Sequence, residues 1–237
     1  MPRVLHRSTI SMLVDPKGAL QFFQQVLNTE DLDGDDSTLP SVDISDLPSI
    51  QHCGEVIISG QYQSIRSSDT RILLELAFLA ALVRSISPIS PSMVFELGTF
   101  MGRCTRLFAS NSPDDCKIVT LDLPRAQVEH DVGADYRNCE FTDRIEQCYG
   151  NSLTFDFSPW YGQADFVWVD ACHDYEYVAS DSCQALQLCR SGGWIAWHDY
   201  RHTAWWSGVT RAVRELRTDY PGLMHLRGTT IALLKKP

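Results

Sequence analysis

The sequence predicts an α/β fold, namely a doubly wound, mostly parallel sheet of seven strands with one antiparallel edge strand. From residue 68 onward, apolar strand-like segments alternate with helical segments, which is typical of βαβ units. The run FVWV at 166–169 is apolar throughout, as expected for a strand that is covered on both faces. The last two strand-like segments, 223–228 and 229–236, have no helix between them, which predicts the antiparallel edge strand.

The length and composition fit one globular domain with an N-terminal extension. The 237 residues are 44% hydrophobic and 21% charged, so the chain can bury a full core without disulfide or metal staples. We assign residues 68–237 to the domain and residues 1–67 to an extension of helix and loop. In the extension, Leu20–Leu27 predicts an amphipathic helix, and the acidic segment 28–48 is typical of a loop.

The domain is predicted to begin with a long helix over residues 68–85. A Ser-Asp pair starts this segment and two prolines stop it, at 88 and 91. The segment is apolar around most of its circumference, so we expect it to be buried on several sides. An apolar, β-branched strand over 92–98 and a helix over 102–110 follow it.

The same alternation predicts the remaining elements. Helix 175–190 carries Val178, Ala185 and Cys189 on one side, and helix 206–216 carries its apolar residues at helical spacing. The strands are short apolar runs bounded by polar residues or glycine, and they cover 117–123, 144–150, 164–170, 192–199 and the closing pair.

The net charge and hydropathy exclude two classes of partner. With 20 basic and 30 acidic residues, the formal charge is −10, which disfavours binding to nucleic acid through phosphates. In the most hydrophobic stretch, the longest uncharged apolar run is Leu76–Val83, which is too short to cross a bilayer. The N-terminus lacks the apolar core and cleavage site of an export signal, so we predict a cytoplasmic location.

The eight cysteines do not form a recognisable metal or redox motif. The sequence contains no C-x-x-C, which excludes a zinc ribbon and a thioredoxin-type site. In a long chain without an export signal, we expect scattered cysteines to be mostly small buried hydrophobic residues.

The strongest motif is a glycine turn between the first strand and the next helix. Glu96, Gly98 and Gly102 form the pattern E-x-G-x-x-x-G, in which glycine allows a sharp turn and a close approach to a ligand. The dinucleotide pattern G-x-G-x-x-G fails because position 100 is Phe. The next strand ends in Asp122, where a carboxylate can accept hydrogen bonds from two ribose hydroxyls. Together these residues predict a ligand site rather than a simple packing turn.

In their order, the segments ELGTFMG, LDLP, YGNS, the strand ending at Asp170 and GGWIAWHD resemble class I S-adenosylmethionine-dependent methyltransferases, which have a Rossmann-like fold. The motifs D-x-x-H-x-Y and G-G-x-x-x-x-H-D-Y resemble methyltransferase family 24. This family includes macrocin-type sugar O-methyltransferases and cephalosporin-hydroxylase-like proteins. The resemblance implies S-adenosylmethionine as cofactor, bound by Glu96, Gly98, Thr99, Phe100, Gly102, Asp122, Asn151, Ser152 and Asp170. The family usually has Asp where this chain has Asn151.

Two strand ends predict a metal site beside the cofactor. Asp170 ends one strand and His198-Asp199 end the next, and such ends line the ligand crevice of an open α/β sheet. This set suits Mg²⁺, or Mn²⁺ if the imidazole binds, and the ion would lower the pKa of a substrate hydroxyl. The resemblance supports Asp170 and Asp199, whereas macrocin-type enzymes have an acid in place of His198. The alternative is that both acids cap loops.

His173 is the predicted general base. It lies three residues after Asp170, and an imidazole can take the proton of an attacking hydroxyl near neutral pH. The resemblance places the base of the family at this position. The alternative for His173 is a structural role.

These observations predict metal-assisted O-methylation of a hydroxyl on a small molecule, such as a sugar or a glycosylated natural product. Two alternatives stay open at this point, namely a cephalosporin-hydroxylase-like or other redox enzyme, and a cofactor-binding partner without catalysis. We expect a small-molecule acceptor as partner, no nucleic acid and no membrane, with a homo-oligomer as a further option. Acceptor specificity is expected to lie in residues 1–67 and in the loops.

Overall fold

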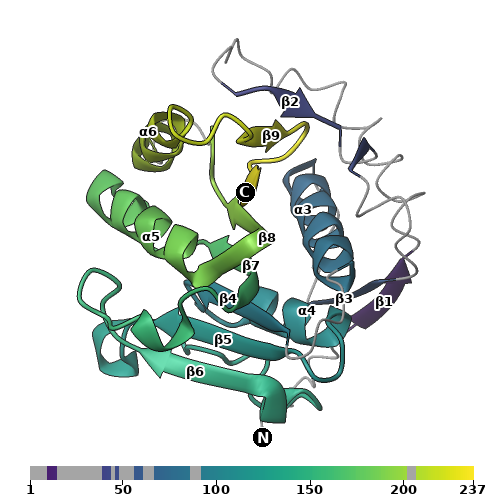
Figure 1. Cartoon of the computed structure of the whole chain (residues 1–237). Helices are drawn as coiled ribbons and strands as arrows, with labels where there is room; N and C mark the ends of the chain where they lie inside the picture. The colour runs from purple at the N-terminus through teal and green to yellow at the C-terminus, as the bar shows by residue number, and fades with distance from the viewer. Residues whose placement is uncertain are drawn as a thin grey trace, which may run out of the picture.

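An eight-stranded sheet forms the centre of the molecule. The computed structural model describes residues 10–14, 39–43, 46–47, 56–60, 67–85, 92–201 and 207–237. The strand order is β2-β9-β10-β8-β7-β4-β5-β6 (Figure 1). These strands are β2 (Ser41–Val42), β4 (Met93–Leu97), β5 (Lys117–Asp122), β6 (Ile145–Tyr149), β7 (Ala164–Val169), β8 (Cys189–Trp197), β9 (Met224–Leu226) and β10 (Ala232–Lys235). The predicted mostly parallel α/β sheet is confirmed.

The predicted antiparallel strand is confirmed as β10, which lies near one edge of the sheet. β6, β5, β4, β7 and β8 pair in parallel, and β10 pairs antiparallel with both β8 and β9. A tight turn at Gly228, which has φ +78°, reverses the chain between β9 and β10. β10 lies next to β8, and β9 lies on the far side of β10, nearer the edge of the sheet. β2 then pairs in parallel with β9, which adds a strand from the segment predicted to be an acidic loop.

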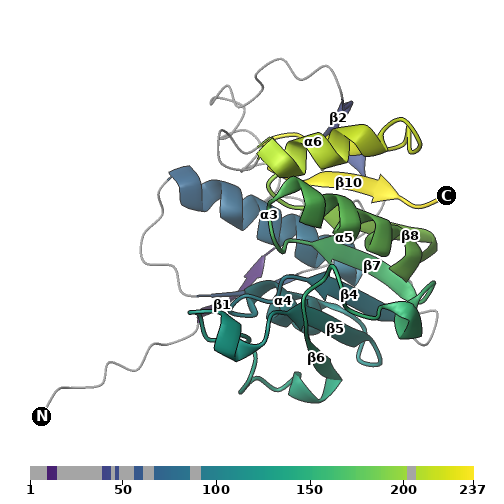
Figure 2. The same cartoon turned by 90° about the vertical axis from the view of Figure 1, so that its left-hand side faces the viewer.

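Helices cover both faces of the sheet. α3 (Ser67–Arg84) and α4 (Arg103–Asn111) lie on one face, and α5 (Tyr175–Leu188) and α6 (Ser207–Leu216) lie on the other (Figures 1 and 2). Alternate strand residues divide between two buried clusters, for example Val94 with the α3 side and Phe95 with the α5 side. This explains the uninterrupted apolar strands, since both faces are buried. Three short 3₁₀ helices, Arg125–Gln127, Thr142–Arg144 and Ser158–Trp160, lie in the connections.

The N-terminal part contributes strands rather than only helix and loop. β1 (Ile10–Val14) and β3 (Val56–Gly60) pair antiparallel in a separate two-stranded sheet. Val56 and Ile58 are buried in the cluster that also contains α3 and α4. The Asn111 side chain of α4 holds β3 in place, since its amide accepts from Ile57 N and donates to Ile57 O, each at 2.8 Å. The predicted helix over Leu20–Leu27 lies outside the described residues.

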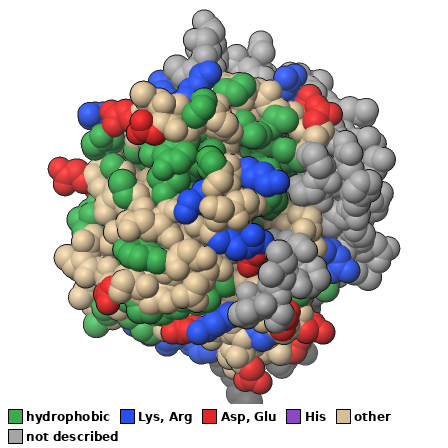
Figure 3. Space-filling view, in the orientation of Figure 1, with side chains coloured by type: hydrophobic (Ala, Val, Ile, Leu, Met, Phe, Trp, Pro, Cys, Tyr) green, Lys and Arg blue, Asp and Glu red, His purple; other side chains and the backbone are tan. Residues whose placement is uncertain are grey.

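The cysteines are more exposed than predicted. All seven cysteines of the described ranges are free thiols, but only Cys116 and Cys189 are buried, and Cys172 and Cys183 are exposed. None of the helices in the described part of the chain is long and apolar enough to cross a membrane. In the view of Figure 3, several Lys and Arg side chains lie near the middle of the visible face.

Candidate functional site

The glycine turn after β4 packs against the loop after β7. Gly98 has φ +100°, and a Cβ added there would lie 2.0 Å from the backbone oxygen of Asp170. Gly98 is therefore needed for the approach of two backbones, whereas the sequence suggested an approach to a ligand. Gly102 starts α4 with φ +85°, and a Cβ there would meet the Tyr136 ring at 2.5 Å. The turn and Asp170 consequently belong to one site.

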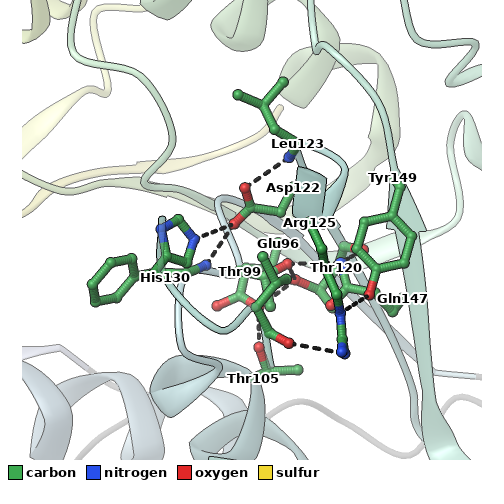
Figure 4. A network of polar contacts seen from close by, with 12 residues as sticks. Glu96, Thr99, Thr105, Thr120, Asp122, Leu123, Arg125, His130, Gln147 and Tyr149 are labelled. Carbon is green, nitrogen blue, oxygen red and sulfur yellow. Dashed lines mark hydrogen bonds and ion pairs between the residues drawn. The ribbon is translucent and has the colours of Figure 1, made fainter. Parts of the chain in front are cut away.

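Glu96 is a buried carboxyl group below this turn (Figure 4). Its Oε2 accepts hydrogen bonds from the hydroxyls of Thr105, at 2.5 Å, and Thr120, at 2.6 Å. Its Oε1 is buried and has no hydrogen-bond partner among the described residues. Burial raises the pKa of Glu96 to about 8, although the two hydroxyls oppose the rise. Glu96 is consequently protonated at neutral pH.

Asp122 holds the glycine turn through the backbone. Its Oδ2 accepts from Phe100 N at 2.6 Å, and its Oδ1 accepts from Leu123 N at 2.7 Å (Figure 4). Phe100 itself has φ +49° and is 60% exposed, with its ring 4.5 Å from that of His130. The His130 Nε2 lies 3.8 Å from Asp122 Oδ2, too far for a hydrogen bond. A carboxylate has about four acceptor positions, so Asp122 keeps capacity for two ligand hydroxyls.

Thr99 is a predicted cofactor residue, but its side chain points into the protein and not toward the surface of the glycine turn. It is buried, and its hydroxyl contacts the Thr120 hydroxyl at 2.7 Å and accepts from Gln147 Nε2 at 3.0 Å. Gln147 in turn accepts from the hydroxyl of Tyr136 at 2.6 Å. Thr99 can therefore offer a ligand only its backbone.

Asn151 and Ser152, the predicted adenine contacts, follow β6. The Asn151 amide donates to the Tyr177 hydroxyl at 3.3 Å and accepts from Leu153 N at 3.0 Å, so it is engaged within the protein. Ser152 lies beside Asp181 of α5. Burial raises the pKa of Asp181 to about 6, although the Ser152 hydroxyl opposes the rise.

Asp170, His173 and Asp199 come together at the ends of β7 and β8. One ligand atom from each lies within 4.8 Å of the others, a geometry that can hold a metal ion. The His173 Nε2 donates to Asp199 Oδ2 at 2.7 Å. Asp199 has φ +58°, an uncommon conformation for a residue with a side chain and one that is frequent at functional sites. Burial opposes ionisation of Asp199, but hydrogen bonds from His173 and His198 hold its pKa well below the usual range.

His198 differs from its predicted role because both ring nitrogens face carboxylates. Nδ1 lies 3.1 Å from Asp170 Oδ1, and Nε2 lies 3.2 Å from Glu75 Oε2. Burial alone would lower the pKa of His198, but Asp170 and the other surrounding carboxylates raise it well above its usual value. His198 is therefore a hydrogen-bond donor at both nitrogens, and His173 replaces it in the group that can hold a metal.

Glu75 is a site residue that the sequence analysis missed. It lies in α3 and is 5% exposed, and its Oε1 accepts from Thr230 N at 2.7 Å and Thr230 Oγ1 at 2.9 Å. The sequence did contain a clue to this residue, because Glu75 is the single acid between Arg71 and Arg84 in an otherwise apolar helix. A buried acid needs a partner, and the partner here comes from the site.

Two aromatic residues near this edge, Tyr175 and Tyr200, are engaged within the protein. Tyr200 is fully buried, and Tyr175 packs under Arg211 while its hydroxyl donates to Glu215 at 2.5 Å. His202, Trp205 and Trp206 lie outside the described residues.

Comparisons with known proteins match part of the chain to a protein family and most of it to solved structures. Residues 95–200 match the profile of methyltransferase family 24, described as a methyltransferase domain. No curated protein matches the chain significantly. The O-methyltransferase from Bacillus cereus, solved with SAH, is similar with a TM-score of 0.53 and 18% identity, covering 92% of this chain and 91% of that chain. The O-methyltransferase TomG from Streptomyces achromogenes, solved with SAM, has a TM-score of 0.51 and 17% identity, covering 92% and 90%. The methyltransferase PaMTH1 from Podospora anserina, solved with SAH, has a TM-score of 0.53 and 16% identity, covering 92% and 88%.

Proposed function

We propose that the chain transfers the methyl group of S-adenosylmethionine to a hydroxyl of a small molecule, because residues 95–200 match the model of a methyltransferase domain. The observation that carries this proposal is the contact between the glycine turn and Asp170, whose backbone oxygen would lie 2.0 Å from a Cβ at Gly98. That contact puts a cluster of two carboxylates and an imidazole beside the glycine turn, where we propose that the cofactor binds. We further propose a sugar or glycosylated natural product as acceptor, on the family 24 motifs, and a cytoplasmic location.

The residues around the turn fit the cofactor. Glu96 Oε1 is buried without a partner in the described ranges, and a buried polar atom of this kind is satisfied by a bound group or water. Asp122 keeps acceptor capacity after its two backbone hydrogen bonds, which suits the two ribose hydroxyls. The bound cofactor supplies an activated methyl group, and the protein has to orient and deprotonate the acceptor.

A divalent metal also fits the cluster. Asp170 and Asp199 would hold the ion through oxygen, which Mg²⁺ prefers, and His173 lies within reach as a further ligand that Mn²⁺ accepts. When bound, the ion would orient the acceptor hydroxyl and favour its ionised form. The donor set has one His and two Asp, which differs from the two-His, one-carboxylate pattern of iron oxygenases.

His173 is proposed to take the proton of the acceptor hydroxyl. Asp199 supports this role because a carboxylate on one ring nitrogen orients an imidazole and stabilises its protonated form. The acceptor oxygen would bond to the methyl carbon as the bond between that carbon and the sulfonium sulfur breaks, so that S-adenosylhomocysteine is released, and the proton would move from the acceptor oxygen to the imidazole.

Cofactor binding is tested by calorimetry with S-adenosylhomocysteine. The wild type should bind, and Asp122→Ala should weaken binding about tenfold to a hundredfold, because hydrogen bonds to a charged group are lost. Glu129→Ala, a change to an exposed acid in the following segment, serves as the matched control. Absence of binding by the wild type would contradict the proposed function.

A second experiment distinguishes metal binding by Asp170 and Asp199 from proton transfer by His173. Electron paramagnetic resonance of Mn²⁺ should give weaker binding to Asp170→Asn and Asp199→Asn, and unchanged binding to Asp174→Asn, an exposed acid of the same loop. His173→Ala should lower turnover about 10²- to 10⁴-fold even at Mn²⁺ concentrations that saturate the variant, with an acceptor found by screening sugars and phenols. A turnover that saturating Mn²⁺ restores to the wild-type value would instead make His173 a ligand and not the base.

A further inference from the structure

We infer that Glu75 of α3 is a positioning residue for the metal centre, and that it acts on Asp170 through His198. The inference rests on the proposed metal site and deepens it. It concerns a residue outside both motifs of the sequence and outside the matched region 95–200.

The first step is that Glu75 is committed to this contact. The carboxylate is 5% exposed and uses both oxygens, Oε1 for two hydrogen bonds from Thr230 and Oε2 for His198. Its chain neighbours Leu74, Leu76 and Ala77 are also buried, so this part of α3 lies in the interior of the protein. The position of Glu75 is therefore fixed by the helix and by the connection between β9 and β10.

The second step is that Glu75 determines where the His198 ring points. With Nε2 held 3.2 Å from Glu75 Oε2, the opposite side of the ring directs Nδ1 to Asp170 Oδ1 at 3.1 Å. Nδ1 also lies 3.4 Å from Asp199 Oδ2. The Trp168 ring, with its centroid 5.4 Å from that of His198, borders the imidazole from β7. No hydrogen bond joins Glu75 directly to Asp170 among the described contacts, so any influence passes through the ring.

The third step concerns the metal. A hydrogen bond on one oxygen of Asp170 restrains the plane of the carboxylate, and it would therefore orient Asp170 for binding an ion together with Asp199. Outer partners of this type usually change metal affinity 10- to 100-fold when they are removed. Loss of Glu75 should therefore weaken the metal site although Glu75 does not touch it.

Two substitutions separate positioning from charge. In Glu75→Gln, the amide oxygen can keep Thr230 and the amide nitrogen can donate to His198 Nε2, which leaves Nδ1–H directed to Asp170. This variant should bind Mn²⁺ within about threefold of the wild type. Glu75→Leu fits the apolar helix but cannot hold the ring, so its Mn²⁺ affinity should fall about tenfold or more. Thr230→Val is the matched control, because it removes one partner of Glu75 and leaves His198 in contact.

A double-mutant cycle tests the route. His198→Leu should lose as much Mn²⁺ affinity as Glu75→Leu, and the double variant should lose no more than either, because residues that act in series are not additive. Additive losses, or an equal loss in Glu75→Gln, would overturn the inference. If Glu75→Leu does not fold, Glu75→Ala and His198→Leu complete the comparison.

A metal-free readout distinguishes this inference from the proposed function. The nitrogen and proton chemical shifts of the His198 ring report its hydrogen bonds without any ion. They should change in Glu75→Leu and in Asp170→Asn, and stay near those of the wild type in Thr230→Val. Unchanged shifts in Glu75→Leu would overturn the inference. Changed shifts in a protein that binds no Mn²⁺ would keep the positioning role and overturn only the metal site.

Discussion

Replacing Glu96 by Gln should change how the stability of the protein depends on pH. Burial raises the folded-state pKa from the ordinary 4.5 to about 8, so the folded protein keeps a proton that the unfolded chain has lost between these values. The folded state then binds more protons, and the free energy of unfolding falls as pH rises through this window. The glutamine amide of the Glu96→Gln variant carries no titratable proton and retains an oxygen for Thr105 and Thr120.

The magnitude follows from the width of the window. Each pH unit inside it corresponds to about 1.4 kcal/mol, so from about pH 5.5 to about pH 7.5 the Glu96 contribution falls by about 3 kcal/mol. Urea unfolding of both proteins at three pH values, without cofactor, measures the difference. Because all other titrating groups are shared, the free energy of the wild type should fall relative to that of Glu96→Gln by this amount. Parallel curves for the two proteins would mean that Glu96 is ionised in the folded state, which would refute the reasoning.

Two further substitutions test the packing around the site. Gly98→Ala should destabilise the fold by about 3 kcal/mol or more, because φ is +100° and the new Cβ would meet Asp170 O at 2.0 Å. Thermal unfolding measures this loss. A Tm within about 2 °C of the wild type would contradict the prediction. Asn111→Ala should cost about 1–3 kcal/mol, because the buried amide that pairs with Ile57 N and O is lost, and hydrogen exchange at Ile57 should rise. Unchanged exchange there would show that β3 is held by its apolar contacts alone.

Much of the fold after residue 92 could be predicted because the local pattern of the sequence carries it. Buried parallel strands are continuous apolar runs, and the predicted strands over 92–98, 117–123 and 164–170 contain β4, β5 and β7. The location of β10 could not be predicted in this way. Which strand a hairpin pairs with depends on contacts far apart in the sequence, and the apolar pattern of 229–236 is the same at an edge or inside a sheet.

The sequence predicted which residues lie at the site when those residues directly follow strand ends. It did not predict the direction in which an individual side chain points. Asp170, His173 and Asp199 meet because parallel strands end at one edge. His198 also lies at that edge, but its ring turns to Glu75, a residue of a different element that precedes it by most of the domain. The sequence correctly predicted a sharp turn at Gly98, but it attributed the glycine to a close ligand. In the structure, the neighbour that leaves no room for a side chain is the backbone of Asp170.

The pairing of β2 with β9 has a consequence for synthesis of the chain on the ribosome. Ser41 and Val42 emerge early, but their pairing residues His225 and Leu226 are among the last to be translated. Leu39 and Leu47 are buried in the two core clusters of the finished protein, and therefore stay open to chaperones and proteases until the C-terminal hairpin arrives. Nascent chains arrested before β9 should accordingly be cleaved by protease near residues 39–47, while full-length chains released from the ribosome resist cleavage there.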